Sequence, residues 1–157
     1  MSLFRGENIY APKIIGATDG SPAPAGVVGE AIVVSVAVGS PVSLTTTTAK
    51  TVATLTLTPG DWDVSANLNF TGTSATVAAG ANFAGGISTT TNTLPTDGSE
   101  VQYDPTTVTT ASFKSGSAIG RKIFTVSVST PVYLVGVATF TAGTVGGYGS
   151  LTARRIR

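Results

Sequence analysis

The sequence contains no cysteine and no histidine among its 157 residues, and these absences remove most of the usual chemistry of enzyme sites. Without cysteine, the chain has no disulfide and no thiolate nucleophile. Without histidine, it lacks the usual general base, the commonest metal ligand and every Ser-His or Cys-His pair. The composition therefore favours a non-enzymatic binding or structural protein, and no residue pattern in it predicts a cofactor.

Charged residues are also scarce. They make up 11% of the chain, whereas ordinary soluble proteins contain roughly 25%. The mean hydropathy of +0.32 is correspondingly high, yet no segment approaches the ~20 consecutive apolar residues that a membrane-spanning helix needs. We therefore expect no membrane partner, and we expect the chain to bury part of its surface against copies of itself.

The few charges are unevenly placed along the chain. Every acidic residue lies at or before Asp104, and only cations follow it. One interpretation is solvated strand ends, and the other is a basic patch that meets an acidic partner or a neighbouring subunit. The residues of this predicted partner-binding patch are Arg121, Lys122, Arg154 and Arg155. A net charge of +1 and few aromatic residues do not favour nucleic-acid binding.

Apolar and polar residues alternate strictly over positions 61–70, and Pro59-Gly60 places a turn just before them. Successive side chains of a strand point to opposite faces, so the apolar residues would line one face. These residues are Trp62, Val64, Ala66, Leu68 and Phe70. We expect this row to lie in the core, and we expect Asp61, Asp63 and Asn67 to face water.

Further strand signals follow one another from residue 27 onward, separated by turns rich in glycine and proline. They cover residues 31–38, 51–58, 82–89, 107–113, 121–128, 132–140 and 148–156. No segment has the 3.6-residue period of a helix. The pattern predicts an all-β fold, a jelly-roll-like antiparallel β-sandwich of about eight strands, with an immunoglobulin-like sandwich as the alternative. The glycine-rich residues 143–149 are interpreted as a hairpin connection.

Residues 1–26 differ from the predicted sandwich domain at residues 27–157. Prolines and glycines exclude a helix there and disfavour a paired strand. Five side chains are nevertheless too apolar for a solvated tail: Phe4, Ile9, Tyr10, Ile14 and Ile15. We interpret the segment as an extended arm that docks on a partner through these side chains, with a frayed terminus as the alternative.

Two of the predicted strands, at residues 31–38 and 132–140, are apolar on both faces. In an isolated antiparallel sandwich, one face of each strand usually meets water and is polar. We therefore expect another copy of the chain to cover the second face of both strands. The alternative is that these are central strands with extra apolar residues.

The acidic residues include two groups that could form candidate sites. Asp61 and Asp63 lie two apart on one strand, and glycosidases use carboxylate pairs at comparable separations. Beside a turn, however, such a pair is more simply a solvated strand end. Asp97, Glu100 and Asp104 share one loop, but their spacing matches no calcium-binding loop. We therefore expect neither a catalytic site nor a metal site.

Three parts of the sequence carry a further signal. The first is Gly26-Val27-Val28-Gly29-Glu30, and the second is the stretch Val52–Val64, which contains Thr58-Pro59-Gly60-Asp61-Trp62. The third joins Tyr133–Phe140 to the closing Leu151-Thr152-Ala153-Arg154-Arg155-Ile156-Arg157. Together these parts resemble small virion proteins of tailed bacteriophages and prophages, of the decoration or tail-fibre type. The resemblance covers residues 26–157 and leaves out the arm.

The resemblance implies a homotrimeric β-sandwich on the exterior of a virion. A decoration (cement) protein would use its arm to clamp the major capsid protein or another virion protein. A tail-fibre or receptor-binding tip would attach by its arm and bind a host surface glycan with its distal loops. A secreted carbohydrate-binding module is the non-viral alternative. We favour the decoration protein, because the sequence shows a short apolar arm and no shaft.

Overall fold

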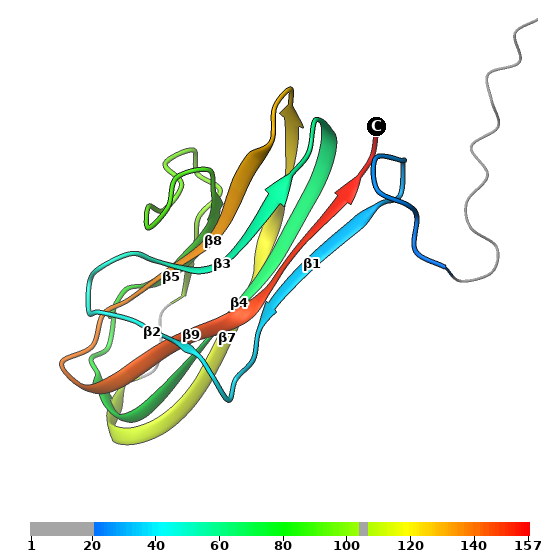
Figure 1. Cartoon of the computed structure of the whole chain (residues 1–157). Helices are drawn as coiled ribbons and strands as arrows, with labels where there is room; N and C mark the ends of the chain where they lie inside the picture. Colours follow the sequence, from blue (N-terminus) through cyan, green and yellow to red (C-terminus); the bar gives the residue numbers. More distant parts are fainter. Residues whose placement is uncertain (1–20, 104–106) are drawn as a thin grey trace, which may run out of the picture.

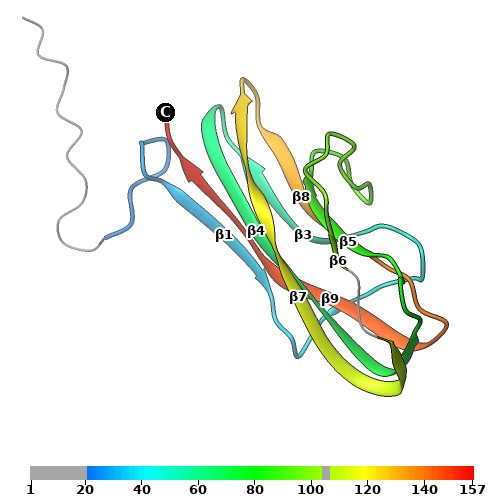
Figure 2. The same ribbon diagram turned by 180° about the vertical axis from the view of Figure 1, so that it is seen from behind.

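A computed structural model describes residues 21–103 and 107–157 of the chain (Figure 1). These residues form two antiparallel sheets packed face to face, and they contain no helix. Figure 2 shows the same two layers from behind. The predicted all-β sandwich is confirmed. Residues 1–20, which hold most of the predicted arm, lie outside the described residues.

Sheet A has the strand order β1-β9-β4-β7, and the short β2 pairs with β9. Its strands are β1 (Ala31–Val36), β2 (Val42–Ser43), β4 (Gly60–Val77), β7 (Val108–Val126) and β9 (Ala142–Arg155). Sheet B has the order β3-β8-β5-β6. Its strands are β3 (Lys50–Leu57), β5 (Phe83–Ser88), β6 (Val101–Tyr103) and β8 (Thr130–Ala138).

The chain crosses repeatedly between the sheets. When the two-residue β2 is left aside, consecutive strands alternate between sheets A and B, except that β5 and β6 pair within sheet B. The first and last strands, β1 and β9, pair with each other. This order is compatible with two interlocked Greek keys. The jelly roll stays a prediction, and the strand order supports it.

Two strands are longer than the sequence predicts. The predicted strands at residues 107–113 and 121–128 lie largely within one strand, β7, which continues through residues 114–120 between them. The glycine-rich residues 143–149 are not a hairpin connection, because they pair with β4 inside β9. Both strands pair with β4, which has 18 residues. The long β4 supplies a pairing partner along their length, and their own sequences give no sign of it.

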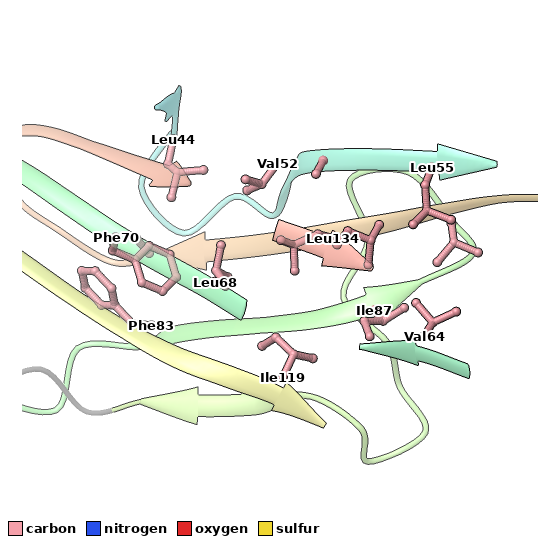
Figure 3. Close-up of a cluster of buried hydrophobic side chains, with 14 of the residues drawn as sticks. Leu44, Val52, Leu55, Val64, Leu68, Phe70, Phe83, Ile87, Ile119 and Leu134 are labelled. Atoms are coloured by element: carbon pink, nitrogen blue, oxygen red, sulfur yellow. The ribbon is translucent and has the colours of Figure 1, made fainter. Parts of the chain in front are cut away.

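The core lies between the two sheets, and the alternating residues 61–70 contribute its centre. Trp62 and Val64 are fully buried, and Leu68 and Phe70 are nearly so. Figure 3 shows side chains of both sheets meeting there, including Leu134 of β8. The predicted core row is therefore confirmed, although Ala66 in its middle is only partly buried. Asp61 was wrongly expected to face water: it is buried, and its carboxylate forms a 2.6 Å ion pair with Arg157.

The chain covers the outer face of sheet B with its own loop, residues 89–100. Pro95 lies so close to Gly86 that a side chain there would overlap its ring. Val135, which is paired with Gly86 on the same face, is fully buried. The expectation that another copy covers this face of β8 is therefore wrong, because the covering segment belongs to the same chain.

The outer face of sheet A is different. On its edge strand β1, Ile32 and Val34 point to the core side, whereas Val33 points outward and is 61% exposed. Whether another copy covers this second face of β1 is thus untested. Val33 is the exposed residue that such a copy would bury.

Trp62 offers a direct test of the core. Truncation to alanine empties the space between the sheets and removes the indole N–H bond to the Thr58 carbonyl (2.8 Å). We expect Trp62→Ala to lower the free energy of unfolding by about 3–5 kcal/mol, measured by urea denaturation. The smaller loss expected for Trp62→Phe is the matched control. Because Trp62 is the only tryptophan, a native emission maximum like that of a solvated indole would contradict its burial.

Candidate partner-binding surface

The base of the predicted arm is tied to the last strand. The Gly29 N–H donates to the Arg155 carbonyl at 3.0 Å, and the Arg155 N–H donates to the Glu30 carbonyl at 2.8 Å. Residues 21–30 and the C-terminus therefore lie at the same end of the sandwich (Figure 1). The five apolar arm residues predicted to bind a partner, Phe4, Ile9, Tyr10, Ile14 and Ile15, lie outside the described residues.

We call this end of the sandwich the arm end. It is formed by residues 21–30, the β3–β4 turn at 58–60, the β7–β8 turn at 127–129, and residues 155–157. Exposed apolar side chains collect there: Val27, Val28 and Ile156 are each more than 40% exposed, and Val128 is 67% exposed. The arm end is therefore more apolar than a purely solvated loop region would be.

Arg155 is the central residue of the arm end, and it is only 5% exposed. Its Nε donates to Glu30 Oε2 at 2.9 Å and its Nη1 to the Pro59 carbonyl at 2.6 Å. Its Nη2 donates to the Thr58 hydroxyl, and its guanidinium lies 4.3 Å from the centre of the Trp62 ring. The structure thus places Arg155 inside the protein, and it is not one of the surface cations that the sequence suggested.

This network joins three parts of the sequence that lie far apart along the chain, at residues 26–30, 52–64 and 151–157. Glu30 ends the first part, Thr58 and Trp62 belong to the second, and Arg155 belongs to the third. Gly60 belongs to it as well, because a side chain at this position would overlap the Arg155 guanidinium, and its φ of +140° favours glycine. Residues from these three distant parts of the sequence therefore meet in one buried structural cluster.

Glu30 is the counter-charge of this cluster. Its carboxylate accepts the Gly26 N–H at 2.8 Å as well as the Arg155 bond. The Gly26 hydrogen bond is the main cause that lowers the pKa of Glu30, and Arg155 adds to it, while burial acts in the opposite direction. The ionised form of Glu30 therefore holds the arm base against β9.

The remaining three cations of the predicted patch separate onto two surfaces. Arg121 and Arg154 lie on the outer face of sheet A, on either side of Asp63. Arg121 donates its Nε to Asp63 at 2.9 Å, and this contact raises the pKa of Arg121. Lys122 points the other way, where its ammonium binds Asp97 at 2.6 Å and lies over the Phe124 ring. Only Arg121 and Arg154 thus share one surface.

Two exposed side chains of this surface were missed by the sequence analysis as binding candidates. Val33 lies two residues from Ala31, the β1 partner of Arg154, and Ile123 pairs with Asp63 and is 56% exposed. The sequence could have indicated Val33 as a candidate, since its strand is apolar on both faces. It could not have indicated Ile123, because the face of a strand that points outward depends on partners that are distant in sequence.

The aspartates of the described residues are each paired with a cation. Asp61 and Asp63 each bind an arginine, Arg157 and Arg121 respectively. Asp97 accepts a hydrogen bond from Lys122 and two more from Ser99. These contacts lower the pKa of Asp97, and the Lys122 bond contributes most. Residues 21–103 and 107–157 contain no group of three carboxylates, histidines or cysteines that could hold a metal ion. Asp104 lies outside these ranges.

A scan against protein families, a search of curated proteins and a search of solved structures each found no match. No helix in the described part of the chain is long and apolar enough to cross a membrane.

Glu30 gives a pH-dependent test of the cluster. Because its folded pKa is below its unfolded value, the stability it contributes is present above the unfolded pKa and is lost as the pH falls through the folded pKa. We expect Glu30→Gln to lower the free energy of unfolding at pH 7 by about 1–3 kcal/mol. The variant should also lose less further stability on acidification than the natural chain does.

Denaturant unfolding at a series of pH values measures both effects. Glu100→Gln is the matched control, because Glu100 lies in the 89–100 loop, outside the arm end, and its carboxylate accepts a 2.7 Å hydrogen bond from Gln102. Equal acid sensitivity of the Glu30→Gln variant and the natural chain would show that Glu30 is not the counter-charge of Arg155.

Proposed function

We propose that this protein is a non-enzymatic structural protein on the exterior of a bacteriophage virion. It is a homotrimeric decoration (cement) protein that binds the capsid surface through its N-terminal arm. The observation that carries the proposal is the construction of the arm end. There, the resemblance-bearing segments form one buried cluster that holds the base of an apolar arm.

An anchor must transmit force between the arm and the domain. The Glu30–Arg155 pair joins residues that are 125 positions apart and lies next to the fully buried Trp62. A pull on the arm is therefore resisted by a central β9 strand and by the core, rather than by a loop. Such a base suits a segment whose function is attachment.

The arm has enough apolar surface to act as an anchor. Burying each of its five large apolar side chains is worth about 1.5–3 kcal/mol before the cost of ordering the segment. Three arms in one trimer would bind together, so that each arm raises the effective concentration of the others. The apolar side chains of the arm end add contact area around the point of attachment.

A receptor-binding tip remains the second candidate, because the 89–100 loop forms a small pocket. Its cavity of about 210 Å³ is lined mainly by hydroxyl groups, with Asp97 and Lys122 at its edge. Hydroxyl and carboxylate groups can bind a sugar. A secreted carbohydrate-binding module is less well supported, since every aromatic residue of the described part of the chain is buried or only partly exposed, whereas sugar stacking needs an open ring.

Deletion of residues 1–25 tests the anchor. We expect the truncated protein to fold and to remain a trimer, but to lose its association with virions of the phage that encodes it. Co-sedimentation and cryo-electron microscopy of particles measure the occupancy. A full-length Lys13→Ala variant is the matched control, because it changes a polar arm residue and keeps the apolar ones. Undiminished occupancy without the arm would transfer the anchoring role to Arg121 and Arg154.

The proposed trimer has a separate test. Light scattering of the purified full chain at micromolar concentration should give three times the chain mass of 15.7 kDa. A single-chain mass would contradict the homotrimer, whatever the arm binds.

A further inference from the structure

The outer face of sheet A carries a shallow groove in the half of the sandwich away from the arm end. Two cavities, of about 280 and about 380 Å³, adjoin there, because Thr71 and Thr73 of β4 line both of them. One extends over β9 toward Pro41, and the other extends over β7 toward Lys114. Each is close to or within the range of about 300–1,000 Å³ that is usual for ligand pockets. We call the two cavities together the threonine groove.

Strand register explains why the face is hollowed here. Ser43, Gly146, Thr71 and Lys114 form one row across β2, β9, β4 and β7. Gly146 has no side chain to fill the space between its neighbours in this row. The Pro41 ring also lies so close to Gly146 that a side chain there would overlap it. The hollow is therefore built into the pairing of sheet A and does not depend on the position of a loose loop.

Hydroxyl groups line the threonine groove. They belong to two residues of β4 and to one residue each of β2, β7 and β9: Thr71, Thr73, Ser43, Ser112 and Thr144. Within residues 21–103 and 107–157, none of these five hydroxyls makes a side-chain hydrogen bond. The hydroxyls of Thr46 and Thr130, by contrast, donate to carbonyls of the chain. A hydroxyl donates one hydrogen bond and accepts up to two, so the groove offers both functions to a ligand.

Lys114 gives the threonine groove its charge. The side chain is exposed and makes no ion pair with a carboxylate of the described residues. No carboxylate within the described ranges lines either cavity. The groove thus combines neutral hydroxyls with one cationic donor, and this charge favours a ligand with an acidic group near β7.

We propose that the threonine groove binds a carbohydrate chain, with an acidic sugar next to Lys114. Sugar hydroxyls donate and accept hydrogen bonds as the groove hydroxyls do, and two adjoining cavities fit consecutive sugar units. Pro41 and Phe113 are partly exposed and offer apolar surface to the C–H groups of a sugar. Neither is an open ring, so binding depends mainly on hydrogen bonds. We therefore expect a single groove to bind in the millimolar range.

Other chain-like ligands fit the threonine groove less well. An extended peptide usually adds to a free strand edge, whereas β9 and β4 at the centre of the groove are already paired on both sides. A nucleic acid needs several cations along its phosphates, and Lys114 is the one cation that lines the described cavities. A carbohydrate needs neither a free edge nor a basic surface.

The threonine groove and the arm end lie far apart on the same sheet. Thr71 is eleven residues beyond Gly60 in β4, which corresponds to about 35 Å of strand. In Figure 1, residues 21–30 and the C-terminus lie at one end of the sandwich, and β2 lies toward the other. A copy attached through its arm would therefore leave the groove accessible. The inference goes beyond the proposed attachment and requires neither the arm nor the trimer.

Threonine-to-valine variants test the site, because valine keeps the branched shape of threonine and removes only the hydroxyl. The probes are acidic hexasaccharides of galacturonic acid and of hyaluronan, and neutral maltohexaose. We expect Thr71→Val and Thr73→Val each to weaken binding of an acidic probe about three- to tenfold. Thr152→Val is the matched control, because Thr152 lies on the same face of β9, in the half nearer the arm end.

Amide NMR spectra of the isotope-labelled full chain measure affinity and position together. An acidic probe should shift residues of β2, β4, β7 and β9 around the groove in a saturable manner. Lys114→Gln should reduce the affinity for the acidic probe to that for maltohexaose. Arg154→Gln, which removes an exposed cation of the same sheet near the arm end, should leave both affinities unchanged.

Each outcome decides the inference. Saturable shifts around the groove that weaken in Thr71→Val and Thr73→Val, but not in Thr152→Val, support it. Binding that is lost only in Thr96→Val would place the sugar in the pocket of the 89–100 loop and overturn the groove. The absence of saturable shifts with all three probes up to about 10 mM also overturns it. Equal affinity for acidic and neutral probes overturns the role of Lys114. None of these results depends on virion binding, so the proposed attachment stands or falls separately.

Discussion

The guanidinium of Arg155 holds the arm end together, and much of the structure depends on it. A buried cation is costly unless it is paired and fully hydrogen-bonded. Arg155 meets that condition with Glu30, the Pro59 carbonyl and the Thr58 hydroxyl, while the Trp62 ring lies against its flat face. These partners come from the arm base and from the β3–β4 turn. One side chain on β9 therefore aligns the place where the arm leaves, the turn between the sheets and the only tryptophan.

The parts of the fold that the sequence predicted are those governed by local geometry. Alternation over residues 61–70 placed Trp62 and Leu68 in the core, because the two-residue period of a strand decides which side chains share a face. The same pattern could not reveal that Asp61 is buried, since its partner Arg157 is 96 residues away. Likewise, the second apolar face of β8 correctly indicated a cover. That the cover is the chain's own 89–100 loop is a long-range contact without a local signal.

The candidate partner-binding cations show the same limit: the sequence identified them, but it did not reveal which of them are exposed. The sequence analysis grouped four cations near predicted strand ends in one patch: Arg121, Lys122, Arg154 and Arg155. Adjacent residues of a strand point to opposite faces, and this separates Arg154 on the outer surface from Arg155 in the interior. Two residues in a row can therefore have unrelated roles. Their different burial depends on the register between β9 and its neighbours, which is known only once the sheets are assembled.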